Sequence, residues 1–108
     1  MRYLKSFEKQ LTSEEKERIG NYVIIYPCSV TPNERKFFNN NIGQIVAIHI
    51  NPIGNENSIK VQYDKEIIPF NVILGKDSTY STRNYEITHE SKYKEDLEAL
   101  LLSKKFNI

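Results

Sequence analysis

The sequence predicts an α+β protein that is mainly β, in which a small five-stranded barrel carries short helices at its N-terminal end and one helix at its C-terminal end. Apolar and β-branched residues in the middle of the chain form short runs separated by polar turns, which is typical of a β meander. The two ends of the chain show helical spacing of apolar residues together with capping signals. The length of 108 residues fits a single domain.

Charge and cysteine content limit the classes of function. Lys and Arg number 15 against 14 Asp and Glu, and this balance argues against non-specific nucleic-acid binding. The one cysteine, Cys28, cannot form an intramolecular disulfide, so the fold needs no oxidising compartment. The N-terminus lacks the apolar core of a signal peptide, and the apolar run at 22–27 is too short to span a membrane. We expect a soluble cytoplasmic protein without a membrane partner.

The first 20 residues predict a helical extension of the domain. Apolar residues at helical spacing predict a short helix over 2–10. Thr12 and Glu15 have the spacing of a capping box, in which each side chain accepts a hydrogen bond from the other residue's backbone N–H. Gly20 lies where a glycine ends a helix, so a second helix is predicted over 13–19.

The next segment predicts a buried strand followed by a long loop. Residues 21–27 are β-branched or aromatic on both faces, so we expect both faces to be covered. Residues 28–41 predict a loop with one helical turn, for which Thr31 is the expected cap. Phe37 and Phe38 lie in this loop, and we expect one of them to pack against the barrel. A long loop in a compact domain is a place to look for function.

Residues 41–72 predict a meander of three strands, over 41–50, 58–64 and 66–72. In the first strand, strict alternation places Val46, Ile48 and Ile50 on one face and Ile45, Ala47 and His49 on the other. The side chains expected to face the core in the other two strands are Ile59, Val61, Tyr63, Ile68, Phe70 and Val72.

The rest of the chain predicts a polar loop over 75–82, a short strand over 84–89 and an amphipathic helix over 91–106. In the strand, Tyr85 and Ile87 are expected on the core side. The helix carries an apolar stripe made of Tyr93, Leu97, Leu100 and Leu101. We expect this stripe to close one end of the barrel, and the alternative is that it docks a partner.

Catalytic and metal-binding patterns are not expected from this sequence. Gly75 and Lys76 lack the earlier glycine and the following Ser or Thr of a phosphate-binding loop. His49, His89 and Cys28 are far apart and form no spaced ligand pair. We therefore expect no enzymatic activity, no cofactor, no metal and no small-molecule substrate.

Two segments carry resemblances to known families. Residues 42–48, with Gly43 near their start, and residues 59–64, which end in an aromatic and an acid, resemble the SH3-like barrels of the KOW and Tudor type. The resemblance covers 21–89, and it implies a non-catalytic module whose loops carry recognition. The opening residues 1–8 resemble those of small proteins from tailed bacteriophages, which implies an accessory component of a phage particle, in a virion or in the host cytoplasm.

Two binding functions follow from these features. The first is a protein-binding or structural module that binds a protein partner or assembles with itself, since aromatic and basic loop residues suit interfaces. Its expected contact residues are Phe37, Phe38, Tyr80 and Arg83. The alternative is an SH3-like nucleic-acid-binding module with a local basic strip. This strip consists of Lys60, Lys65, Lys76 and Arg83, and interleaved acids weaken its field.

Overall fold

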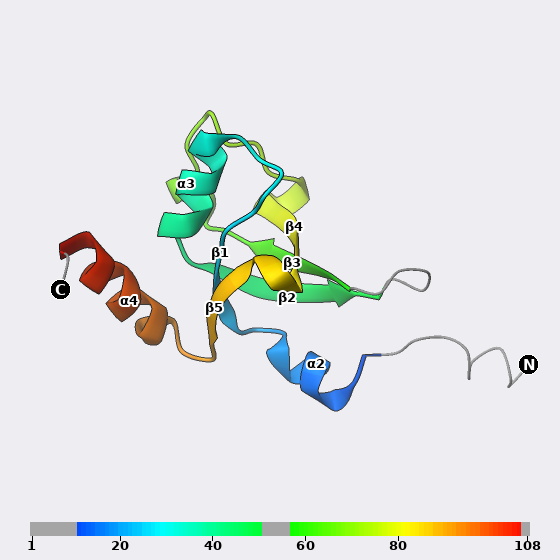
Figure 1. Cartoon of the computed structure of the whole chain (residues 1–108). Coiled ribbons are helices and arrows are strands. Elements are labelled where there is room, and N and C mark those ends of the chain that lie inside the picture. The colour runs from blue at the N-terminus through cyan, green and yellow to red at the C-terminus, as the bar shows by residue number, and fades with distance from the viewer. Residues whose placement is uncertain (1–10, 51–56, 107–108) are drawn as a thin grey trace, which may run out of the picture.

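The computed structural model describes residues 11–50 and 57–106. The helix predicted over 2–10 and the phage-like opening residues lie outside this described part. Along the chain, the helices and strands are α2 (Ser13–Arg18), β1 (Tyr22–Ile25), α3 (Pro32–Asn40), β2 (Gly43–His49), β3 (Ser58–Gln62), β4 (Thr79–Arg83), β5 (Ile87–Ser91) and α4 (Lys94–Phe106). The strands form one antiparallel sheet of five strands in the order β4-β3-β2-β1-β5 (Figure 1).

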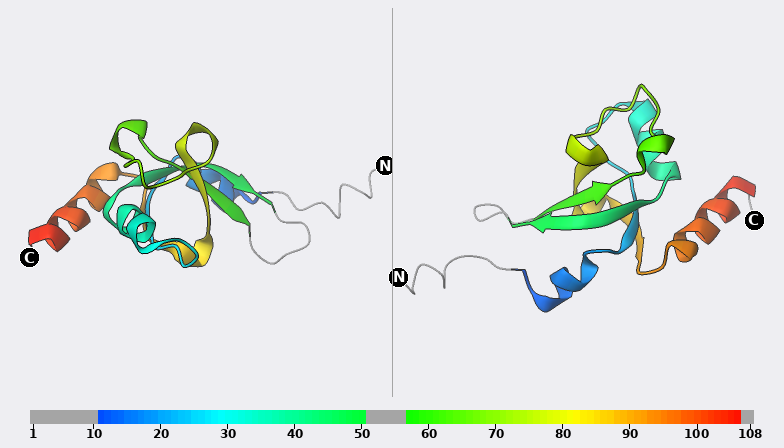
Figure 2. Two further views of the ribbon diagram at one scale, coloured as in Figure 1. Left: turned by 90° about the horizontal axis from the view of Figure 1, so that it is seen from above. Right: turned by 180° about the vertical axis from the view of Figure 1, so that it is seen from behind.

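The sheet is curved because its two edge strands are neighbours in the chain. Only the 3-10 turn Asn84–Glu86 separates β4 from β5, although these strands lie at opposite edges of the sheet. The edges of a flat five-stranded sheet would lie about 19 Å apart, whereas three residues of 3-10 helix rise about 6 Å. The sheet therefore curls until the end of β4 approaches the start of β5 (Figure 2). The helices and the antiparallel sheet confirm the α+β class. The described strands leave the sheet open, so the predicted closed barrel is not confirmed.

Helix α2 forms as its capping signals predict. The backbone N–H of Thr12 donates to Glu15 Oε1 at 2.9 Å, and the N–H of Glu15 donates to Thr12 Oγ1 at 3.1 Å. Gly20 follows the helix at a φ of +101°, in the left-handed region that glycine adopts without strain. Helix α2 thus ends within one residue of the predicted boundary.

The segment predicted as a long loop contains a true helix, α3. Thr31 and Glu34 form a second capping box, and Pro32 occupies the first helical position. The helix continues to Asn40 because Phe37 and Phe38 both turn into the core, with 7% and 0% exposure. The helix is therefore longer than the single helical turn that was predicted in this loop.

Strands β1 to β3 supply most of the core. Val23, Ile24 and Ile25 are all buried, which confirms that both faces of β1 are covered. The pairing of β2 with β3 shifts between Ile45 and Ala47, and this irregularity lets both Ile45 and Ile48 reach the core. Strict alternation in β2 was therefore a wrong prediction. The predicted inward set of this segment is confirmed, since Ile59 and Val61 of β3 and Tyr63 just after it are at most 3% exposed.

The third predicted strand is not formed. Residues 66–72 begin in a 3-10 turn and continue without regular structure, and the fourth strand lies instead at Thr79–Arg83, in the predicted polar loop. Pro69 has no backbone N–H for a ladder, whereas β4 contains β-branched and aromatic residues that suit a strand. Phe70, predicted to face inward, is 99% exposed, although Val72 is buried.

Two predictions near the C-terminus also need correction. Tyr85, expected on the core side, is 66% exposed because it lies in the 3-10 turn before β5, while Ile87 packs against the core as expected. Helix α4 forms as predicted, but of its stripe only Leu97 is buried. The helix contacts β1 and β5 and then projects from the end of the molecule (Figure 1). It does not close a barrel end.

Candidate functional site

The four residues predicted to contact a protein partner do not form one surface. The rings of Phe37 and Phe38 lie 5.5 Å apart in the core, and the ring of Tyr80 lies 4.6 Å from that of Phe38. Burial raises the pKa of the half-buried Tyr80. Arg83, at the end of β4, is exposed. Phe38 is therefore corrected from a contact residue to a core residue, and Phe37 is a core residue that reaches the surface only in the wall of a groove beside α3.

The basic strip of the alternative function is divided into two parts. In the β3–β4 pair, Lys60 lies opposite Ser81 and Ser58 lies opposite Arg83, so Lys60 and Arg83 are diagonal neighbours on the outer face. Lys65 and Lys76 lie in turns at the other end of this pair. The exposed acids at that end are Asp64, Glu66 and Asp77. Lys60 and Arg83 thus lie together with the Glu86 carboxylate close to Arg83, and the charges at the two turns are mixed.

The edge of β4 is protected against the addition of a further strand. At one end the N–H of Gly75 donates to the carbonyl of Thr79 at 2.8 Å, and at the other the N–H of Arg83 donates to Glu86 Oε1 at 3.1 Å. Short edge strands with occupied backbone groups are poor templates for strand pairing. This edge is therefore a weak candidate for binding an extended peptide.

A buried carboxylate, that of Glu86, holds the β4–β5 corner together. Its Oε1 accepts from Thr82 Oγ1 as well as from the Arg83 N–H, and its Oε2 accepts from the Cys28 N–H at 3.0 Å. Burial alone would raise the pKa of Glu86, but these hydrogen bonds and the charge of Arg83 outweigh it and lower the pKa. With its oxygens occupied by groups of the fold, this carboxylate has a structural role.

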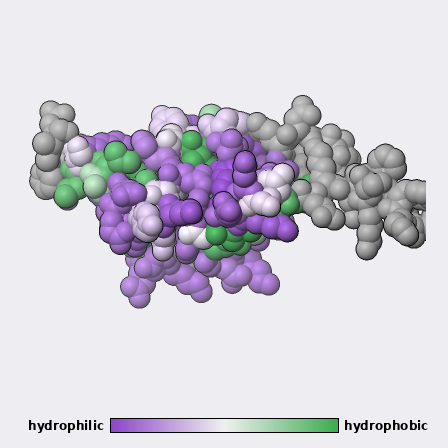
Figure 3. Space-filling view, turned by 90° about the horizontal axis from the view of Figure 1, so that it is seen from below, coloured by the Kyte–Doolittle hydropathy of each residue, from purple (hydrophilic) through white to green (hydrophobic). Residues whose placement is uncertain are grey.

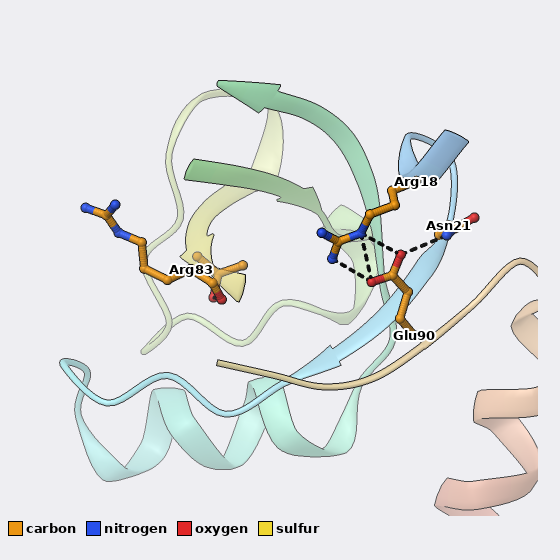
Figure 4. A network of polar contacts seen from close by, with 5 residues as sticks. Arg18, Asn21, Arg83 and Glu90 are labelled. Atoms are coloured by element: carbon orange, nitrogen blue, oxygen red, sulfur yellow. Dashed lines mark hydrogen bonds and ion pairs between the residues drawn. The ribbon is translucent and has the colours of Figure 1, made fainter. Parts of the chain in front are cut away.

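A second polar network joins α2 to β5 (Figure 4). Arg18 Nη2 lies 2.6 Å from Glu90 Oε1, and Asn21 Nδ2 donates to Glu90 Oε2 at 2.8 Å. Burial alone would raise the pKa of Glu90. The hydrogen bonds from Arg18 and Asn21 outweigh this effect, so the pKa of Glu90 is lowered. No local spacing in the sequence reveals these residues, because their partners lie about 70 positions away. Arg18 and Asn21 satisfy Glu90 internally, so the network also has a structural role.

Exposed apolar side chains lie both in the segment 68–74, where Phe70 and Ile73 are 99% and 82% exposed, and on α4. Tyr93, Leu100 and Leu102 are 64%, 44% and 56% exposed, and Leu101 is half-buried. Figure 3 shows apolar side chains gathered at the end of the molecule where α4 lies. We name Tyr93, Leu100, Leu101 and Leu102 the α4 apolar surface, which wraps around the helix because Leu100 and Leu102 lie on opposite sides of it.

Two grooves flank the α4 apolar surface because α4 diverges from the sheet after Leu97. One groove of about 250 Å³ lies between α4 and the β1–β5 side of the sheet. Its lining includes Ile24, Asn39, His89, Leu100, Leu101 and Lys104. The other groove, of about 330 Å³, lies between α4 and the end of α3, where Ile42, Ile67 and Leu102 contribute apolar atoms. Side chains of a partner have room in both.

Within 11–50 and 57–106, no group of three or more His, Cys, Asp or Glu side chains is placed to hold a metal ion. In the same part of the chain, no helix is both long enough and apolar enough to cross a membrane. Cys28 is an exposed thiol in the turn after β1.

Comparison of the chain with protein-family models, with curated proteins and with solved structures found no match.

Proposed function

We propose that this protein is a non-catalytic protein-binding module and that its partner docks on the α4 apolar surface. One observation carries the proposal: α4 buries Leu97 but leaves Leu100 and Leu102 about half exposed beside open grooves. Full burial of a leucine side chain is worth about 1.5–3 kcal/mol. A partner that covers this surface therefore gains binding energy from residues that the fold leaves in water.

The proposed contact surface lies on α4, whereas the sequence predicted contacts in the loops around 28–41 and 75–83. The SH3-like character is part of the proposal, and the antiparallel order β4-β3-β2-β1-β5 supports it. A role as an accessory component of a phage particle rests on residues 1–8 alone. The nucleic-acid alternative keeps only the neighbouring pair Lys60 and Arg83 in its favour, because the other two lysines lie among acids.

Site-specific photo-crosslinking tests the proposed surface. Benzoylphenylalanine is placed in turn at Tyr93, Leu100 and Leu102 of the full chain, expressed in cells of its source. The control position is Glu17, which is exposed on α2. We expect an adduct with a polypeptide, either another protein or a second copy, from at least one α4 position and none from Glu17. If no α4 position gives a protein adduct, or if Glu17 gives the same adduct, the proposal is wrong.

A further inference from the structure

We infer that the partner of α4 is α4 of a second copy of this chain, paired antiparallel across a two-fold axis at Leu100. The inference rests on the proposed function and names its partner.

One face of α4 carries charges of opposite sign on either side of a leucine. Residues at i, i+4 and i+8 lie along the same face of a helix, so Asp96, Leu100 and Lys104 form one row. Tyr93 comes just before the helix and is also exposed. This row therefore reads negative, apolar and positive from its N-terminal to its C-terminal end.

Such a row is complementary to itself when a second copy runs in the opposite direction. In an antiparallel pair centred on Leu100, Asp96 faces Lys104 of the second copy, and Lys104 faces Asp96 of the second copy. The two leucines meet at the axis. A parallel pair would place Asp96 against Asp96 and Lys104 against Lys104. Closed two-fold interfaces require a self-complementary surface, and the charge order selects the antiparallel one.

The structure has space beside this row for apolar side chains of the second helix. The groove of about 250 Å³ lies next to Leu100 and Lys104, and buried Ile24 forms part of its wall. Because α4 projects from the end of the molecule (Figures 1 and 2), a second helix can approach it along this side. The apolar side chains at the centre of the pair enter the groove, and the charged pairs lie at its ends.

The length of the helix sets the expected strength of the dimer. A helix of 13 residues is about 20 Å long, and one helix pair buries less than the roughly 1,200 Å² of a standard interface. We therefore expect a reversible dimer whose population rises with protein concentration.

Charge-reversed variants give the sharpest test. Lys104→Asp alone places Asp96 against a second acid, and Asp96→Lys alone places two lysines together, so each variant should dimerise at least about 10-fold more weakly than the unaltered chain. A one-to-one mixture of the two variants restores opposite charges in both pairs. We expect sedimentation equilibrium and native mass spectrometry of the full chain to show the heterodimer in the mixture.

A matched pair of leucines tests the face of the helix. Leu100 and Leu102 have similar exposure but point about 160° apart around α4. Leu100→Ala should weaken the dimer at least about 10-fold, and Leu102→Ala should leave its dissociation constant within about 2-fold. Circular dichroism checks that each variant keeps its helix. Asp96→Lys also removes the acceptor of the Ser91 hydroxyl, so Lys104→Asp serves as the charge test that leaves this bond in place.

Several outcomes would overturn the inference. These are an unaltered chain that stays monomeric at millimolar concentration, a Lys104→Asp variant that dimerises normally, and a mixture without heterodimer. Equal weakening by the two leucine variants would also refute the proposed face. If the unaltered chain is monomeric but an α4 position crosslinks to another protein, the inference fails and the proposed function stands. If there is neither a dimer nor an α4 adduct, both fail.

Discussion

Thr82 Oγ1 donates a hydrogen bond of 2.8 Å to Glu86 Oε1 at the corner where the two edge strands of the sheet approach each other. Thr82 belongs to β4 and is 1% exposed, and Glu86 ends the 3-10 turn before β5. The second carboxylate oxygen reaches the backbone of Cys28, beyond the end of β1. One side chain thus links β4, the turn and the β1 end, and it fixes the curvature of the sheet.

We expect Glu86→Gln to lower the free energy of unfolding by about 2 kcal/mol, because hydrogen bonds to a charged acceptor are stronger than those to an amide and one amide atom cannot accept. Urea denaturation at pH 7 measures the change. Glu17→Gln, at an exposed position of α2, is the control and should stay within about 0.5 kcal/mol. Equal effects of the two substitutions would show that Glu86 does not hold the corner.

Acid should destabilise the fold through Glu86 and Glu90. The pKa of each carboxyl is lowered below its ordinary value of 4.5 in the folded protein. The unfolded chain therefore binds more protons, and stability that is present above pH 4.5 is lost as the pH falls through the folded pKa values. Urea midpoints between pH 7 and pH 3 should show this fall. Glu86→Gln should reduce its size, and an unchanged pH dependence in that variant would contradict the assignment.

A side chain at Gly43 is expected to destabilise the fold. A Cβ atom at this position would collide with Val61 Cγ1 and lie 2.8 Å from Tyr63 Cζ. Gly43→Ala should therefore cost about 1–3 kcal/mol of unfolding free energy. In a Val61→Ala background the same substitution should cost less, because the colliding methyl group is gone. A double-mutant cycle measures this coupling, and simple additivity of the two effects would contradict the close contact.

Phe38 and Phe70 give a direct comparison. Phe38 was predicted to contact a partner and is buried, whereas Phe70 was predicted to face the core and is exposed. Phe38 is fully buried, so Phe38→Ala should cost about 3–5 kcal/mol. Phe70 is 99% exposed, so Phe70→Ala should change the free energy of unfolding by less than about 0.5 kcal/mol. Thermal or urea denaturation of both variants checks the contrast. A large loss of stability in Phe70→Ala would show that residues 68–72 pack more closely than the structure has them.

Removing the Tyr63 hydroxyl should stabilise the protein. The hydroxyl oxygen is buried without a hydrogen-bond partner, and burial raises the pKa of Tyr63. Because an unsatisfied buried polar group costs about 1–3 kcal/mol, Tyr63→Phe should raise the free energy of unfolding by about 1 kcal/mol. Tyr22→Phe, at a half-buried tyrosine of β1, provides the comparison. A loss of stability in Tyr63→Phe would mean that the hydroxyl has a partner.

Local signals in the sequence were sufficient for several elements. The capping pair Thr12 and Glu15 specifies the start of α2 because both partners lie within one helical turn. The alternation in β3 specifies its buried face because side-chain direction in a strand without a bulge follows position parity. The spacing of its apolar residues predicted the C-terminal helix, as did the acidic residues in its first turn and the basic residues in its last turn.

Tertiary structure decided the rest, including the candidate site. The Glu86 and Glu90 networks join residues up to 72 positions apart, and no local pattern specifies such partners. Residues 66–72 have an apolar pattern like that of a strand, yet it is β4 that pairs with β3. Phe70 is therefore exposed to solvent. The stripe on α4 was visible in the sequence, but the angle at which α4 leaves the sheet decides which leucines stay exposed. That angle depends on packing between distant elements, so the sequence determined the apolar face and the tertiary structure determined its availability to a partner.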